Sequence, residues 1–214
     1  MSNLRVLLTI TDGCDIEDKD GRQFKRAVEK LQPAPVVSLS CGIGESDVDH
    51  HGLAMLAALT GGRHIIVQGS EGIRQALDDL VGRIVFRGQA VVAADAQRAI
   101  VASVTQVSAA RVPVDLLFLI DCSNSMVGQS DDPNVPGDKL KLSRTKEAAI
   151  AVVNSLNPAF DRVGVAQFCG DYRLLLRLTQ DFAAVKRQIM GISPGGSTAL
   201  YSAIGTALDE MLSM

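Results

Sequence analysis

Short apolar runs alternate along the chain with longer amphipathic segments, a rhythm typical of a parallel β-sheet covered by helices. The clearest runs predict strands over residues 4–10, 35–41, 64–68, 114–120 and 162–168. Several of these are rich in Val, Ile or Leu on both alternating sets of positions, as expected for strands that are covered on both faces. A further run, residues 173–178, follows after Gly170 and Asp171, and so short a link predicts an antiparallel hairpin.

The segments between these runs predict helices. Helix-stop signals follow several of them: Pro33, the Thr60-Gly61-Gly62 sequence, and Pro158. The predicted helices span residues 20–31, 47–59, 70–82, 139–156, 181–190 and 198–212. The predicted fold class is therefore α/β, with a Rossmann-like, doubly wound, mostly parallel central sheet, one antiparallel edge strand and helices on both faces.

Residues 84–113 fit this rhythm poorly, because they are rich in Ala and Val and carry few charges. Apolar residues at near-helical spacing predict a helix over residues 89–109, while the β-branched residues leave a strand as the alternative. We interpret the segment as a bridge between two halves of the chain.

Composition narrows the class of function. The net charge is −3, and two Tyr, six Phe and no Trp are present, which argues against a nucleic-acid-binding surface. No apolar stretch approaches the roughly 18–20 residues of a membrane span, and the first residues do not resemble a secretion signal, so we expect no membrane association. The cysteines at 14, 41, 122 and 169 lack metal-ligand spacing, which favours structural thiols and a cytoplasmic location.

Oxygen-bearing side chains gather where predicted strands end. Asp121, Ser123 and Ser125 follow the strand at 114–120, Asp12 follows the first strand, and Thr198 ends a Gly-Gly loop that opens the last helix. Open α/β sheets bind ligands at this carboxyl edge. Any one of these segments alone is more often a helix cap or a turn. Together they offer hydroxyls and carboxylates without imidazole or thiolate, a set that suits Mg²⁺ better than Zn²⁺.

The Asp121-x-Ser123-x-Ser125 pattern, Thr198 after Gly195-Gly196, and Asp12 in Thr-Asp-Gly resemble the metal-ion-dependent adhesion site of the von Willebrand factor A domain. The order differs from that of the family. Residues 1–83 resemble the carboxyl-terminal half of the family and residues 114–214 its amino-terminal half. We therefore predict one circularly permuted domain over residues 1–214, with 84–113 joining the old ends. The alternative is a fragment of tandem domains, whose halves could exchange between two chains.

The resemblance implies a binding function. Ser123, Ser125 and Thr198 are expected to hold Mg²⁺ (with Mn²⁺ or Ca²⁺ as alternatives) through their hydroxyls, and Asp121 and Asp12 to act through waters or hydrogen bonds. A Glu or Asp of a partner protein would fill the open coordination position. The expected protein is thus a non-catalytic adaptor or adhesion-type module, monomeric in the permuted case and a half-exchanged dimer in the alternative case.

Two other functions stay open. A Mg²⁺-dependent phosphohydrolase would use Asp121 as phosphoryl acceptor. Against this, no second carboxylate stands two residues after Asp121, no Lys or His in the loops is an evident general acid, and His50, His51 and His64 are assigned structural or surface roles. The third reading is a scaffold with a vestigial metal site. Cys122 is assigned to packing.

Overall fold

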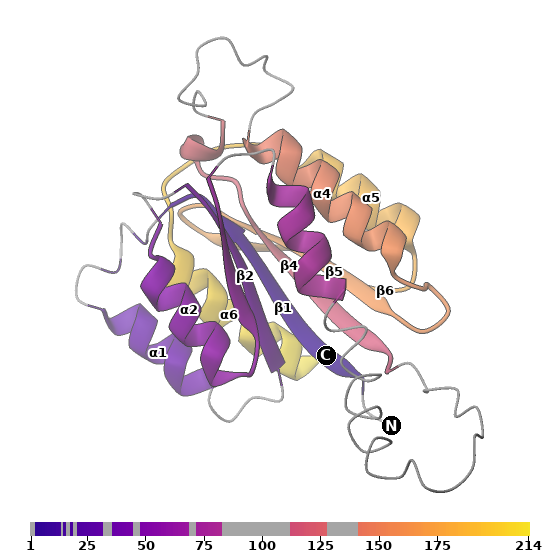
Figure 1. Ribbon diagram of the computed structural model, residues 1–214, viewed down its shortest axis with the longest axis horizontal. Coiled ribbons are helices and arrows are strands. Elements are labelled where there is room, and N and C mark those ends of the chain that lie inside the picture. The colour runs from indigo at the N-terminus through magenta and orange to yellow at the C-terminus, as the bar shows by residue number, and fades with distance from the viewer. Residues whose placement is uncertain are drawn as a thin grey trace, which may run out of the picture.

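The computed structural model describes residues 3–13, 15, 18, 21–31, 36–44, 48–68, 72–82, 112–127 and 141–214. These residues form one six-stranded sheet with the order β3-β2-β1-β4-β5-β6 (Figure 1). All neighbouring strands are parallel except β5 and β6, which are antiparallel. The strands are β1 (Leu4–Thr11), β2 (Val36–Ile43), β3 (Arg63–Val67), β4 (Val114–Asp121), β5 (Arg162–Phe168) and β6 (Tyr172–Thr179).

The middle of the sheet joins the two halves of the chain. Strand β1 pairs with β2 on one side and with β4 on the other, so that Ile10 lies opposite both Cys41 and Ile120. These strands are buried on both faces, which explains why their sequences are apolar at consecutive positions. Because β1 and β4 run parallel and in register, the residues that follow them emerge at the same edge.

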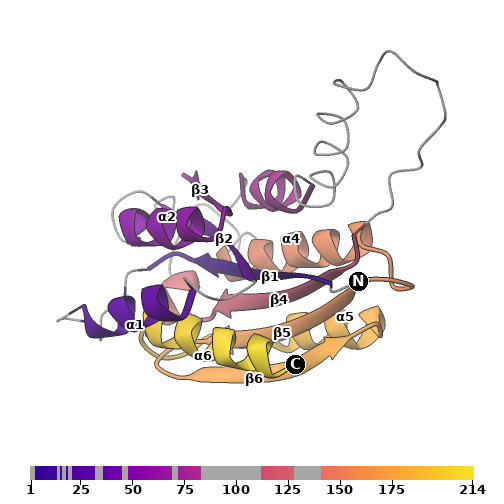
Figure 2. The same ribbon diagram turned by 90° about the horizontal axis from the view of Figure 1, so that it is seen from below.

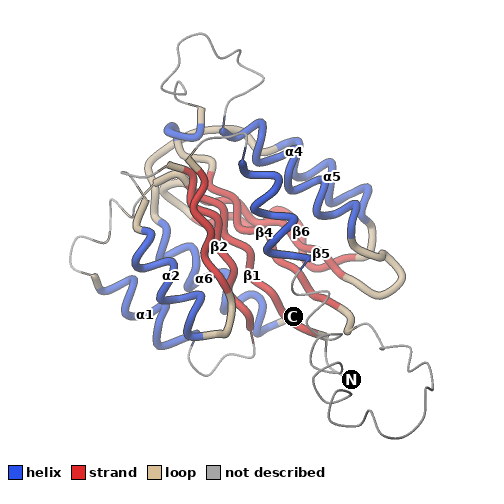
Figure 3. Tube along the Cα trace, in the orientation of Figure 1, coloured by secondary structure: helices blue, strands red, loops and turns tan. Residues whose placement is uncertain are grey.

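Helices cover both faces (Figures 2 and 3). One face packs the helix over residues 73–82 together with α4 (Lys141–Ser155) and α5 (Phe182–Gly191). The other face packs α1 (Arg22–Leu31), α2 (His50–Leu59) and α6 (Leu200–Ser213). A short 3-10 helix, η2 (Asn124–Met126), follows β4. The predicted fold class, with its antiparallel edge strand, is confirmed.

Helix caps account for the main differences in element bounds. Residues 47–59 were predicted as a helix, but α2 begins at His50 because Asp49 is its N-cap and accepts a hydrogen bond from the Gly52 amide. Asp181 caps α5 in the same way, through the Ala184 amide. The last helix begins at Leu200 rather than at Thr198, because the N-cap Ala199 has a non-helical backbone (φ −112°, ψ 64°), and its amide is bonded to the Cys169 carbonyl.

Some predictions fall on residues outside the described ranges. These include nearly all of the bridge over residues 84–113, with its predicted helix at 89–109, and the ends of several predicted helices. Within the ranges that the structure describes, no helix has both the length and the apolar character needed to cross a membrane.

An ion pair between buried Asp115 and partly exposed Arg162 ties β4 to β5 at the amino-terminal edge of the sheet. The Arg162 guanidinium donates to both oxygens of Asp115, at 2.8 Å from Nε and 2.6 Å from the terminal nitrogen. Asn3 donates to the same carboxylate at 2.8 Å. Burial by itself would raise the pKa of Asp115, but these hydrogen bonds and the positive charges nearby lower it overall. The carboxylate is thus held ionised in a buried position.

Candidate metal centre

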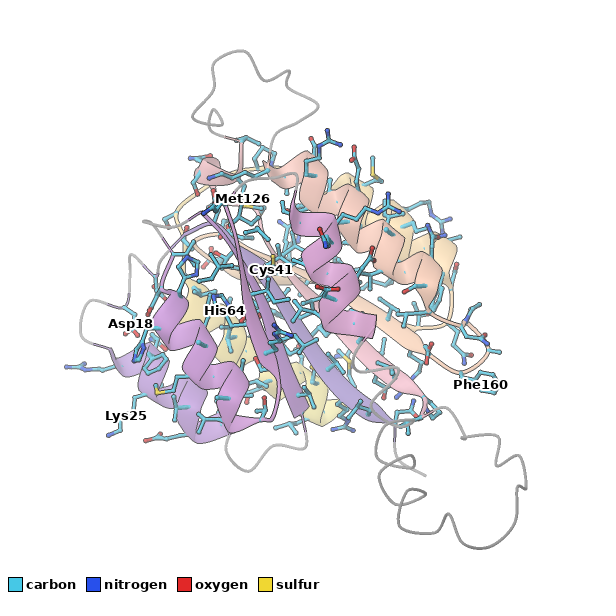
Figure 4. All side chains as sticks on the ribbon, viewed as in Figure 1. Asp18, Lys25, Cys41, His64, Met126 and Phe160 are labelled. Carbon is cyan, nitrogen blue, oxygen red and sulfur yellow. The ribbon has the colours of Figure 1, made fainter. Side chains whose placement is uncertain are left out.

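The carboxyl ends of β1 and β4 bring Asp12 and Asp121 to one edge of the sheet, because Ile10 and Ile120 are partners in the register. This is the upper edge in Figure 1, and Figure 4 labels Met126 of η2 beside it. The two residues are far apart in sequence, so only the pairing of the two halves places them together.

Asp121 is fully buried, and both of its oxygens are hydrogen-bonded. Thr11 Oγ1 donates to one oxygen at 2.6 Å and the Ser123 amide donates to the other at 2.8 Å. Burial raises the pKa of Asp121 to about 6; the two hydrogen bonds oppose this rise and the nearby charge of Asp12 adds to it. Thr11 was not among the predicted site residues, although it adjoins Asp12 in the quoted Thr-Asp-Gly sequence.

A chain of hydrogen bonds connects the two serines to Asp12. The Oγ atoms of Ser123 and Ser125 lie 3.0 Å apart, and Ser125 Oγ donates to Asp12 Oδ1 at 2.7 Å. Ser123 and Asp12 are buried, whereas Ser125 is exposed. The cluster is therefore anchored in the core and opens to solvent on the side of Ser125.

Thr198 is buried against the loop that carries Asp12. A Cβ atom on Gly13 would lie 3.2 Å from Thr198 Oγ1, so the absence of a side chain at Gly13 allows this close approach. The loop before Thr198 is tied to the loop after β4, because the Gly195 amide donates to the Cys122 carbonyl at 2.8 Å. The structure thus brings the five predicted residues together: Asp12, Asp121, Ser123, Ser125 and Thr198.

The site also contains a positively charged side chain that was not predicted from the sequence. Lys141, the first residue of α4, places Nζ 2.8 Å from Asp12 Oδ2. The Asp12 side chain is 0% exposed and that of Lys141 is 27% exposed. Lys141 reaches the site from the start of a helix rather than from a loop. The sequence carries no local signal for this pairing.

Cys122 packs beside the site. Its Sγ lies 3.3 Å from the Phe168 carbonyl oxygen, and burial, followed by the neighbouring thiol of Cys169, raises its pKa to about 12. A thiol held neutral in this way is a poor metal ligand, which agrees with its assignment to packing.

The donor set defines what the cluster can hold. Three hydroxyls and two carboxylates are hard oxygen donors, which suit Mg²⁺, Mn²⁺ or Ca²⁺. In the part of the chain that the structure describes, no group of three or more His, Cys, Asp or Glu residues could hold a metal ion. A cation site of the softer zinc type has no counterpart among those residues.

Comparison with known proteins finds a family model that matches the second half of the chain. Residues 116–214 match the von Willebrand factor type A domain. This match contains Asp121, Ser123, Ser125 and Thr198, whereas Asp12 lies outside it. The residues that bear the predicted hydroxyl ligands are therefore all within the type A match.

Two similar proteins add to this finding. A curated relative, a UPF0353 protein of Mycolicibacterium paratuberculosis (strain ATCC BAA-968 / K-10), is 32% identical over 104 residues, which are 47% of this chain and 29% of that protein. The chain thus spans less than a third of the relative's length. A solved structure of an uncharacterized protein from Alicyclobacillus acidocaldarius subsp. acidocaldarius DSM 446 is similar in fold, with a TM-score of 0.67 and 20% identity over 98% of this chain and 94% of that one. The likeness in fold therefore extends over both halves of the chain, beyond the type A match.

A separate cluster outside the type A match joins β2, β3 and α2. Ser40 Oγ lies 2.9 Å from His64 Nδ1, His64 Nε2 lies 2.9 Å from His50 Nδ1, and His50 Nε2 lies 2.7 Å from the Gly44 carbonyl oxygen. Because that carbonyl only accepts, His50 Nε2 donates to it, and the chain of contacts continues through His64 to Ser40 (Figure 4 labels His64). Ser40 is buried, so the cluster stabilises the packing of α2 on the sheet.

This cluster predicts a loss of stability in mild acid. Burial, followed by the nearby His50, lowers the pKa of His64 from 6.5 to about 4. The unfolded chain then binds more protons between these values, so the free energy of unfolding falls as the pH drops from about 6.5 to about 4. We expect about 1–2 kcal/mol from His64, discounted because the ring is partly exposed.

Urea unfolding at several pH values checks this expectation. In the His64→Gln variant, which keeps a donor and an acceptor but does not titrate, the free energy of unfolding should depend less on pH between about 4 and 6.5. The His51→Gln variant, at an exposed position, should show the same pH dependence as the wild type. Equal slopes for the wild type and His64→Gln would contradict the assignment.

Proposed function

We propose that the chain is a metal-dependent protein-binding module. Ser123, Ser125 and Thr198 would hold a hard divalent cation, Mg²⁺ in preference to Mn²⁺ or Ca²⁺, and Asp12 and Asp121 would act through waters or hydrogen bonds. The observation that carries this proposal is the hydrogen-bonded chain from Ser123 through Ser125 to Asp12, which links residues from the two halves of the sequence. The chemistry of the donor set and the type A match support it.

The site favours a binding role over phosphoryl transfer. Asp121 is 0% exposed and each of its oxygens accepts a hydrogen bond, whereas a phosphoryl acceptor must be accessible to its substrate. The hydroxyl donors are neutral, so they offset little of the charge of a cation. A cation held here supplies an electrophilic position for a carboxylate oxygen of a partner. Exposed Ser125 marks the side from which a partner side chain would enter.

We further propose that residues 1–214 are one type A domain in circularly permuted order. Three features support this interpretation: β1 and β4 are neighbours in the middle of a single sheet, Asp12 meets Ser125 within one chain, and the start of β1 and the end of α6 lie at the same end of the sheet (Figure 1). The proposal implies a monomer, and a half-exchanged dimer in solution would support the tandem fragment instead.

An array of matched peptides tests the binding function. Each peptide that contains one Glu or Asp is paired with the same peptide carrying Gln or Asn. We expect the chain to bind some acidic peptides in Mg²⁺, to lose them in EDTA, and to lose them when the carboxylate becomes an amide. The Ser125→Ala variant should bind none of these peptides.

Two results would favour another function over metal-dependent protein binding. Binding that does not depend on Mg²⁺ would favour the scaffold with a vestigial site. Hydrolysis of an aryl phosphate that requires Mg²⁺ and disappears in Asp121→Asn would favour the phosphohydrolase.

A further inference from the structure

The contact between Lys141 and Asp12 places a positive charge inside the candidate metal centre. Nζ of Lys141 lies 2.8 Å from Asp12 Oδ2, and Ser125 Oγ donates to the other oxygen at 2.7 Å. Both oxygens of this buried carboxylate are therefore engaged. The ammonium neutralises a charge that would otherwise be buried without a counter-ion, which is strongly unfavourable.

A divalent cation in the same cluster would need the same carboxylate. Asp12 and Asp121 are the two acidic residues of the candidate site, and a cation bound among the hydroxyls of Ser123, Ser125 and Thr198 would lie close to both. Two positive charges at such short range repel one another, and burial reduces the screening by water. The ammonium and the cation thus compete for Asp12.

The position of Lys141 allows its ammonium group to move away from Asp12. Its side chain is 27% exposed, and it stands at the first residue of α4, at the boundary with solvent. A lysine ammonium is strongly hydrated and sits on a flexible four-carbon stem, so it can move from Asp12 into water without moving the helix.

We propose that Lys141 is an internal counter-ion that competes with the divalent cation for Asp12, so that its release accompanies metal binding and sets the affinity of the site. This inference rests on the proposed function, because it requires that the cluster bind a cation. It assigns to Lys141 a regulatory role that is separate from the cation-holding role of the five oxygen-bearing residues.

The proposal predicts two effects of opposite sign in Lys141→Met. Without metal, the variant should melt at a lower temperature than the wild type, because Asp12 loses its counter-ion. The affinity of the variant for Mn²⁺ should be about tenfold or more higher than that of the wild type, which is within the usual range of coupling between two ligands. A lysine that served only to stabilise the fold would produce the first effect without the second.

Calorimetric titration with Mn²⁺ and thermal melting in EDTA and in Mg²⁺ test this on the full chain. Lys141→Arg keeps the charge and can pair with the Asp12 carboxylate, so it should not bind Mn²⁺ more tightly than the wild type. Lys146→Met removes a charge from the same helix, where Lys146 Nζ bonds to the Met190 carbonyl, and should leave the affinity unchanged. Lys141→Gln serves as a second neutral variant if Lys141→Met does not fold.

The outcomes separate the two proposals. Tighter Mn²⁺ binding by the neutral variants alone supports competition. Equal or weaker binding by them, with a wild type that binds, overturns the role of Lys141 and leaves the metal site standing. Absence of Mn²⁺ binding by the wild type and by every variant overturns the metal site and, with it, this inference.

Discussion

Mg²⁺ is expected to raise the melting temperature of the wild-type chain and to leave that of Thr198→Val unchanged. A ligand that binds only the folded state stabilises it by RT ln(1 + [L]/Kd), about 2.7 kcal/mol at 100 times Kd. For a chain of this size that corresponds to a rise of about 5–10 °C. Thr198→Val keeps the shape of the buried side chain and removes only the hydroxyl, so its fold should persist while the cation loses a ligand.

The comparison of melting curves in EDTA and in millimolar Mg²⁺ checks this result. Thr206→Val is the matched control, since Thr206 lies on α6, is outside the site, and donates its hydroxyl to the Ser202 carbonyl. It should respond to Mg²⁺ as the wild type does. An equal rise in Thr198→Val and in the wild type would show that Thr198 is not a ligand.

Arg162→Met is expected to destabilise the chain by about 3 kcal/mol. The substitution removes both hydrogen bonds that Arg162 donates to Asp115 and leaves a carboxylate that is only 2% exposed. Breaking a fully buried pair costs about 3–5 kcal/mol, and the lower end applies here because the Arg162 side chain is itself 38% exposed.

Urea unfolding of three variants tests the origin of this loss. Asp115→Asn combined with Arg162→Met should recover most of the stability, because no buried charge is left without a partner. Arg173→Met, at an exposed position of β6, controls for the loss of an arginine. A free energy of unfolding for Arg162→Met within about 0.5 kcal/mol of the wild type would contradict the assigned role of the pair.

The fold was predictable because its central strands are buried on both faces. Consecutive apolar residues in β1 and β4 are unusual outside such strands, and the short Gly170-Asp171 link excluded a parallel crossover to β6. The candidate site was predictable for a related reason: each of its segments adjoins the end of a strand or the start of a helix, so local sequence indicates the edge at which it lies.

Other contacts could not be predicted, because they depend on how elements pack in space. Lys141 belongs to an amphipathic helix whose sequence does not indicate which loop its first residue will contact. The neighbours His50 and His51 face different sides of α2: His51 is exposed, while His50 contacts His64. The partner of His50, however, is His64 on β3, and no spacing in the sequence indicates that pair. The start of α2 could not be predicted either. The helix begins at His50, and Asp49 is its N-cap.

The position of a bound cation tests the central claim most directly. Crystals grown with Mn²⁺ would show the ion as a peak in an anomalous difference map. The account predicts one peak among the hydroxyl oxygens of Ser123, Ser125 and Thr198, beside the carboxylates of Asp12 and Asp121, and no such peak for Thr198→Val. A well-ordered map without density there at saturating Mn²⁺, or with the ion bound elsewhere on the chain, would contradict it.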